Sequence, residues 1–475
     1  MSIRIHIAWS SAAAVLLTGS RFVLLAILAR RLDSHALGLY AYAQWMVDIG
    51  LLVASLGATG AASRYIAEYR SRPGLMQTFL RLWRIPSFLL PLLGSVIVVL
   101  GAKLTGAELD SEGLGTLMLW ALFAGLWAMQ TAVLIGLQRF DVIFLANLLA
   151  AAVMVLGAAY IPITSQDPST VFLIMASGCA VAYMTGLLPI QRLRRSQAGT
   201  AERLDTASII RYCTNVWITA LLWSLLWSRG EFPLVRHFLG DAQLAYYTVA
   251  LSLVGGAIAG VMLGLSGIAP QVTRYLGEAK LDEAVRLCRK VGDWQLLLSG
   301  GAAAVLIWLA PELLRIAFGP AFTTSASALS LLAAGLPALS FAMHNHMLQI
   351  QTDARFNRNT SLVGLTVLGV AAISLIPSFG IEGAAIARAS TLSLLAVLSA
   401  VYFSTSVGSA GVNWTGFATV MFVTAGSAMA VVLFPAAPFW IRAMLALTIP
   451  LVYVFIIRDT DGRMVLNTMA RKALQ

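Results

Sequence analysis

Two arginines lie where charged residues are rarely found, in long apolar segments. Arg21 falls in the middle of the apolar segment 8–29, and Arg229 ends the segment 211–229. A charge in the middle of a membrane span costs at least about 2.5 kcal/mol, and such a residue usually faces a cavity or a partner. We therefore predict that Arg21 and Arg229 are cations that face each other across a substrate cavity.

Two acidic residues offer a different interpretation of these arginines. Asp48 lies within the apolar segment 37–62 and is expected to be the only buried carboxylate. It either binds a coupling proton or cation or neutralises Arg21, and we favour the ion pair. Glu231 follows Arg229 closely and is the alternative partner for that residue at the membrane interface. In this interpretation the charges stabilise the fold and do not contact substrate.

His344 and His346, separated by Asn345 in the segment 326–349, are candidates for binding sugar hydroxyls or for titration. Residues at positions i and i+2 lie on different faces of a helix, so a metal pair is not expected. A polar role in helix packing is the alternative. The three cysteines are isolated and form no metal-binding motif, and we predict no metal, cofactor or catalytic residue.

The composition shows which elements must position these residues. Of the 475 residues, 59% are hydrophobic and only 11% are charged, against about 25% in soluble domains. A membrane-spanning helix needs about 20 apolar residues, so the chain has enough for about fourteen. This excludes a soluble enzyme, and the long apolar runs exclude a β-barrel of short alternating strands. The sequence predicts an all-α polytopic membrane protein.

Polar residues divide the chain into about fourteen apolar segments. They lie near 8–29, 37–62, 85–105, 114–136, 142–161, 169–190, 211–229, 244–269, 294–314, 326–349, 360–379, 383–405, 414–434 and 440–457. Most of the 32 Lys and Arg residues fall on alternate connections between them. The positive-inside rule then places both termini in the cytoplasm. The net charge of +11 is accordingly a signal of topology, and no nucleic-acid partner is expected.

The first six segments resemble the next six. Three short motifs recur in the same order at nearly constant offsets: RYIAE at 64–68 with RYLGE at 274–278, RFD at 139–141 with RFN at 355–357, and LGLY at 37–40 with LAYY at 244–247. An even number of spans per repeat predicts two lobes in a parallel pseudo-twofold arrangement, with substrate between them. We assign 1–205 to the first lobe, 206–408 to the second, and 409–475 to two further helices and a cytoplasmic tail.

Longer motifs resemble the multidrug/oligosaccharidyl-lipid/polysaccharide (MOP) flippase superfamily, and within it the polysaccharide-transport branch that includes O-antigen flippases. The similarity is carried by LARRLDSHALGLY at 28–40, LGA at 56–58 with RYIA at 64–67, LLRIAFG at 313–319 and IPSFGIEGAA at 376–385. It extends over most of the chain. These motifs consist of glycines and loops of the fold and contain no catalytic signature.

The resemblance implies a MATE-like fold and a bacterial inner-membrane protein. Such a flippase moves polyprenyl-pyrophosphate-linked oligosaccharide units from the cytoplasmic to the periplasmic leaflet by alternating access, for lipopolysaccharide or exopolysaccharide synthesis. Arginines line a cationic cavity in the related lipid II flippases, and guanidinium binds phosphate bidentately, which fits Arg21 and Arg229. The resemblance also implies that the last two helices hold the lipid tail, and that polysaccharide polymerase machinery is a partner.

Two other functions remain open. A multidrug or cation antiporter of the same fold would need acidic residues in its lobes to bind cations. A single Asp48, with Arg21 to neutralise it, argues against this function. An O-antigen polymerase or ligase would need a large periplasmic loop, and the outer loops here are short.

Overall fold

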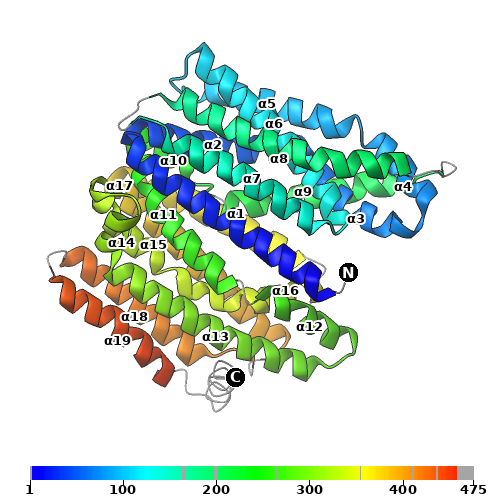
Figure 1. The fold of residues 1–475 in the computed structure, drawn as a ribbon. Coiled ribbons are helices and arrows are strands. Elements are labelled where there is room, and N and C mark those ends of the chain that lie inside the picture. The colour runs from blue at the N-terminus through cyan, green and yellow to red at the C-terminus, as the bar shows by residue number, and fades with distance from the viewer. Residues whose placement is uncertain are drawn as a thin grey trace. The chain divides into compact units, whose positions relative to one another are not determined.

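The computed structural model is helical throughout the residues that it describes, which are 3–162, 167–196, 202–227, 229–262, 265–352, 355–408, 411–434 and 437–456. The chain forms two compact units, Met1–Phe232 and Pro233–Gln475 (Figure 1). Side chains are described for most of these residues. The cytoplasmic tail predicted after 457 lies outside the described residues.

The first unit is a bundle of long helices with short connections. Its elements are α1 (Ile3–Arg31), α2 (Ser34–Ser55), α3 (Ala58–Glu68), η1 (Tyr69–Ser71), α4 (Pro73–Leu82), α5 (Pro86–Leu104), α6 (Ser111–Gly136), α7 (Phe140–Ala159), α8 (Pro168–Ser196) and α9 (Thr206–Trp227). Helix α6 packs between α5 and α8, α7 packs between α1 and α8, and α2 packs on α5. Helix α3 packs on α6, and α9 contacts both α2 and α3.

The second unit is built around α13. Its elements are α10 (Phe232–Leu239), α11 (Asp241–Met262), α12 (Leu265–Gly277), α13 (Leu281–Trp308), α14 (Ala310–Ala317), η2 (Pro320–Ser325), α15 (Ala326–Ala333), η3 (Leu336–Phe341), α16 (Ala342–Gln351), α17 (Arg355–Ser406), α18 (Trp414–Leu433) and α19 (Phe439–Ile456). Helix α13 packs against α15, α18 and α19 (Figure 1). The last two helices therefore belong to this unit.

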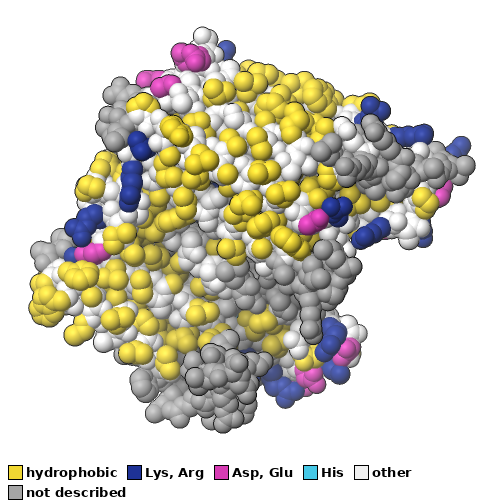
Figure 2. Space-filling view, in the orientation of Figure 1, with side chains coloured by type: hydrophobic (Ala, Val, Ile, Leu, Met, Phe, Trp, Pro, Cys, Tyr) yellow, Lys and Arg dark blue, Asp and Glu magenta, His cyan; other side chains and the backbone are white. Residues whose placement is uncertain are grey.

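Twelve helical stretches in the described residues are long and apolar enough to cross a membrane. One of them is α17, whose helical geometry is broken at Gly380 with φ 62°, between the predicted segments 360–379 and 383–405. Helix α19 adds a shorter apolar stretch, Phe439–Leu451. Large apolar side chains are exposed along many helices, as Figure 2 shows for one face. The all-helical polytopic fold is confirmed, while the number fourteen stays a prediction.

The repeated RYxxE motif adopts the same local structure in both units. The Arg64 Nε lies 3.7 Å from Glu68 Oε2, and the Arg64 guanidinium carbon lies 5.4 Å from the centroid of the Tyr65 ring. In the second unit, the Arg274 Nε lies 3.5 Å from Glu278 Oε1, and the Arg274 guanidinium carbon lies 5.5 Å from the centroid of the Tyr275 ring. Both motifs place the ion pair at i and i+4 at the end of a short helix that follows a span, with Glu68 the last residue of α3 and Glu278 the first residue after α12. The equivalence that was inferred from sequence spacing therefore extends to side-chain contacts.

The division into compact units differs from the predicted lobes at one helix. Helix α9, which begins the predicted second lobe, lies in the first unit because it packs on α2 and α3. The Trp217 indole donates to the Leu52 carbonyl over 3.1 Å, and the backbone of Cys213 lies directly against Gly57. The lobe boundaries at 205 and 408 come from the sequence repeat, whereas the two units are defined by their internal contacts. The lobe boundaries therefore stay a prediction.

Candidate functional site

A cavity of about 640 Å³ lies inside the first unit. Helices α1, α2, α3, α6, α7 and α8 line it. Many of the lining side chains are too short to fill the space between the helices, among them Ala124, Ala128, Ala150, Ala151 and Ala182. The volume is within the range of small-molecule sites, which is about 300–1,000 Å³. The small residues of α6, α7 and α8 therefore create an interior space that the longer side chains of α1 and α2 enter.

Arg21 lies on the wall of this cavity. Leu17, Ser20, Arg21 and Leu24 all line it, and their spacing is that of one helical face. The Arg21 side chain is exposed to the cavity and forms no ion pair with a described residue. An arginine that is not neutralised within the protein leaves its guanidinium free to bind an anion. The structure thus places Arg21 where a substrate-binding cation needs to be, and its role stays a prediction.

Asp48 lines the same cavity but does not pair with Arg21. Its Oδ1 accepts a hydrogen bond from the Gln44 amide over 3.1 Å, one turn earlier on α2. The side chain is exposed, so the expectation that Asp48 is the only buried carboxylate is wrong. Among the described residues the buried carboxylate is Glu231, which is 1% exposed in the turn after α9. Asp48 avoids burial because the short side chains around the cavity leave it accessible.

Tyr40 lines the same cavity as Arg21 and Asp48. Its ring is buried and stacks on Trp120, with centroids 5.9 Å apart, and Trp120 stacks in turn on Phe172. The structure therefore brings two of the sequence-predicted residues, Arg21 and Asp48, together with a cavity-lining tyrosine that sequence reasoning missed. Its recurrence in the repeated LGLY and LAYY motifs was the available signal.

Arg229 is not part of the cavity lining. It lies in the turn after α9, with a left-handed φ of 76° that is uncommon for a residue other than glycine. Its guanidinium is 5.3 Å from the Phe232 ring centroid, a distance suited to a cation–π contact. The turn after α9, and not the middle of a span, therefore positions this second arginine.

Removing the charge of Glu231 is expected to lower the melting temperature, whereas Asp48→Asn leaves it nearly unchanged. A buried polar group that loses an interaction costs about 1–3 kcal/mol. Substitutions at exposed positions usually stay within about 0.5 kcal/mol. Thermal unfolding of purified Glu231→Gln and Asp48→Asn in the same detergent measures the difference. Equal melting temperatures for the two variants would contradict the opposite burial of these carboxylates.

His344 and His346 do not share a site. His344 is 2% exposed, its Nε2 lies 2.8 Å from the Gly411 carbonyl, and its ring packs edge-on against Phe403. His346 is partly buried, and its Nε2 is 3.4 Å from the Thr273 hydroxyl. The contacts of His344 are those of a polar core residue, because its ring is enclosed by α17 and the turn before α18. They favour the packing interpretation over sugar binding.

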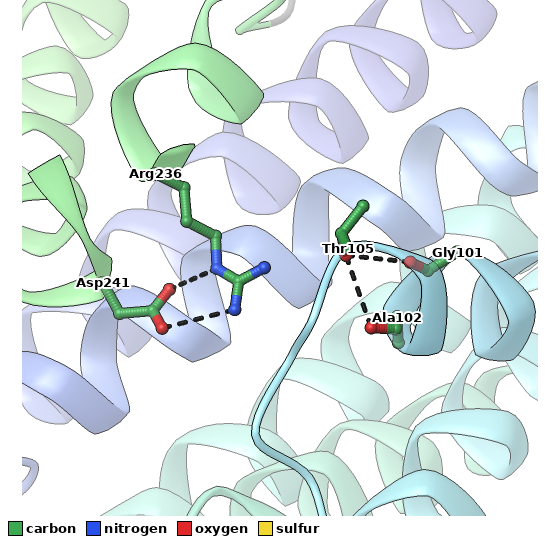
Figure 3. A network of polar contacts seen from close by, with 5 residues as sticks. All are labelled: Gly101, Ala102, Thr105, Arg236 and Asp241. Carbon is green, nitrogen blue, oxygen red and sulfur yellow. Dashed lines mark hydrogen bonds and ion pairs between the residues drawn. The ribbon is translucent and has the colours of Figure 1, made fainter. Parts of the chain in front are cut away.

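Two further buried cations were missed from the sequence. Arg388, which is 6% exposed, lies inside the predicted segment 383–405 and could have been found by scanning that segment for charge. Arg236 forms a largely buried ion pair with Asp241, with Nε 2.7 Å from Oδ1, between α10 and α11 (Figure 3). Figure 3 also shows Thr105, which donates to the Gly101 carbonyl and ends α5 in the first unit. The Arg236–Asp241 pair joins two consecutive helices, which is a structural role.

Comparison with known proteins identifies the family. A family model described as polysaccharide biosynthesis protein matches residues 6–263, more than half of the chain. This chain belongs to that polysaccharide biosynthesis family. No curated protein matches the chain.

Solved structures show that this member of the family has the MOP superfamily fold. The lipid II flippase MurJ in an inward-closed conformation is 12% identical, with a TM-score of 0.66 over 94% of this chain and 98% of that one. An inward-facing multidrug resistance MATE transporter is 14% identical, with a TM-score of 0.62 over 86% and 95%. A MOP transporter from Pyrococcus furiosus, described as having a binding pocket of reversed polarity, is 12% identical with a TM-score of 0.59 over 86% and 96%. These three similar structures are described as a lipid II flippase and two transporters.

Proposed function

We propose that this family member is a flippase that moves polyprenyl-pyrophosphate-linked oligosaccharide units from the cytoplasmic to the periplasmic leaflet of the bacterial inner membrane. The observation that carries the proposal is a cavity in a polysaccharide biosynthesis protein whose wall holds an arginine, Arg21, that forms no ion pair with a described residue. The electrostatic cost of a pyrophosphate inside the bilayer is the main barrier to such transport. A guanidinium lowers this barrier because it forms paired, charge-assisted hydrogen bonds with phosphate oxygens.

Other features of the chain fit the same function. Arg229, in the turn after α9, supplies a second arginine in the first unit. Helices α18 and α19 pack together against α13 and expose large apolar side chains such as Phe422 and Leu447, a surface suited to a polyprenyl tail. We infer that both termini are cytoplasmic, that transport proceeds by alternating access, and that polysaccharide polymerase machinery takes up the product.

Asp48 favours a second candidate function, a cation-coupled multidrug antiporter, because it places a carboxylate on the cavity wall. The two candidates predict different phenotypes. If the protein is the proposed flippase, deleting its gene leaves lipid-linked oligosaccharide units on the cytoplasmic side of the inner membrane and removes the surface polysaccharide, while drug tolerance is unchanged. Reintroducing the intact chain restores the polysaccharide.

The measurement is the amount of surface polysaccharide together with the sidedness of the labelled lipid-linked units in membrane vesicles. Unchanged polysaccharide and a lowered tolerance to cationic drugs would instead support the antiporter.

A further inference from the structure

The first unit contains a second, smaller cavity of about 180 Å³, distinct from the one described above. It lies between the start of α5, the later part of α6 and the end of α8. Its walls are Trp83, Arg84, Ser87, Phe88, Leu126, Met129, Gln130, Val133, Tyr183, Leu187, Ile190 and Gln191. None of these residues is acidic. The cavity is large enough for several water molecules, or for a polar group of similar total size.

The entrance of this cavity lies where a charged surface meets an apolar one. Arg81 and Arg84 are exposed at the junction of α4 and α5. Directly after them, Ile85 and Phe88 are 72% and 56% exposed, as expected of side chains that face lipid tails. Arginines beside exposed apolar residues mark the level of the lipid head groups, where Trp83 is also typical. The same connection is among the basic ones that predict the cytoplasmic side, whose leaflet carries anionic lipids.

A buried side-chain oxygen in the wall of the cavity has no partner among the described residues. Gln130 is 9% exposed, and its Oε1 accepts no hydrogen bond from a described residue. Buried side-chain oxygens of this kind are usually paired, so the position calls for a hydrogen-bond donor. At the entrance, the Arg84 guanidinium likewise forms no ion pair with a described acidic residue. The cavity thus has one unpartnered acceptor in its wall, beside Gly186 of α8, and one cation at its mouth.

We propose that this cavity binds the head group of an anionic glycerophospholipid, with phosphatidylglycerol as the best match. The phosphodiester accepts hydrogen bonds from Arg84, and a glycerol hydroxyl donates to Gln130 Oε1. The acyl chains then run along the exposed apolar side chains of α5. Phosphatidylcholine supplies the phosphate but no donor for Gln130, and its quaternary ammonium brings a positive charge into a cavity without acidic residues.

The test uses the full-length protein, purified in a mild detergent and stripped of native lipid. Native mass spectrometry and thermal unfolding are recorded with dioleoyl phosphatidylglycerol, phosphatidylethanolamine or phosphatidylcholine, and with inorganic phosphate. We expect phosphatidylglycerol to bind at least about tenfold more tightly than phosphatidylcholine and to raise the melting temperature. Arg84→Gln and Gln130→Leu should each weaken its binding by about tenfold, since each removes one of the two polar contacts.

Arg81→Gln is the matched control, because Arg81 is an exposed arginine at the end of α4 that does not line the cavity. It should keep phosphatidylglycerol binding within about twofold. Equal loss in Arg81→Gln and Arg84→Gln would show that only surface charge attracts the lipid, and would overturn the site. Equal binding of all three lipids would also overturn it. Full stabilisation by inorganic phosphate alone would assign the cavity to a free anion instead of a lipid.

Discussion

Arg21→Ala is expected to reduce export of surface polysaccharide by a factor of about 30 or more while the protein level in the membrane stays unchanged. Arg21 is on the cavity wall and has no ion pair among the described residues, so its removal takes a cation from the substrate without exposing an unpaired carboxylate. Losing one member of a desolvated charge pair costs about 2–5 kcal/mol, and each 1.4 kcal/mol changes a rate or equilibrium tenfold. Complementation of a deletion strain, with polysaccharide quantified per cell, measures the effect.

Two variants make this result specific to the cavity. Arg21→Lys keeps the charge but loses the bidentate geometry, and should retain an intermediate amount of export. Arg30→Gln, at the exposed end of the same helix and outside the cavity lining, should retain nearly all of it. If Arg21→Ala exports as much polysaccharide as the wild type, Arg21 does not contact the substrate. The flippase proposal itself is tested separately, by the phenotype of the gene deletion.

Gly57→Ala is expected to destabilise the first unit strongly. Gly57 joins α2 to α3 with a left-handed φ of 77°, and a Cβ at this position would lie 2.1 Å from the Cys213 carbonyl oxygen. That oxygen belongs to the backbone of α9 and cannot move without displacing the helix. The cost should reach about 3 kcal/mol or more, because overpacking alone costs about 1–3 kcal/mol and the backbone strain adds to it.

The check is the melting temperature and the fraction of protein that elutes as a single species in detergent. Two other glycines of the unit provide a graded comparison. A Cβ at Gly60 would meet only the Val216 side chain at 2.7 Å, which can rotate, and a Cβ at Gly19 would meet nothing within 4 Å. The expected order of destabilisation is Gly57→Ala, then Gly60→Ala, then Gly19→Ala. Equal effects at Gly57 and Gly19 would show that α9 does not pack on this corner as described.

The location of Arg21 illustrates how much of the candidate site the sequence can predict. The apolar segments follow from composition, and the 3.6-residue period places Leu17, Arg21 and Leu24 on one face of α1. The two RYxxE motifs also form equivalent ion pairs in the two units, as their sequences predict, because contacts between residues i and i+4 depend on helix formation alone. These are properties of single helices and their immediate termini.

The tertiary structure decides which residues the side chains on these helix faces contact. Asp48 bonds to Gln44 and not to Arg21, and Tyr40 joins these residues on the cavity wall, where its ring stacks on Trp120. Helix α9 joins the first unit because Gly57 lets its backbone approach, a contact between residues more than 150 positions apart. The sequence alone therefore determined which side chains each helix presents. Which of these side chains contact each other depends on how closely neighbouring helices pack. The spacing between helices is set by residues that are distant in the sequence.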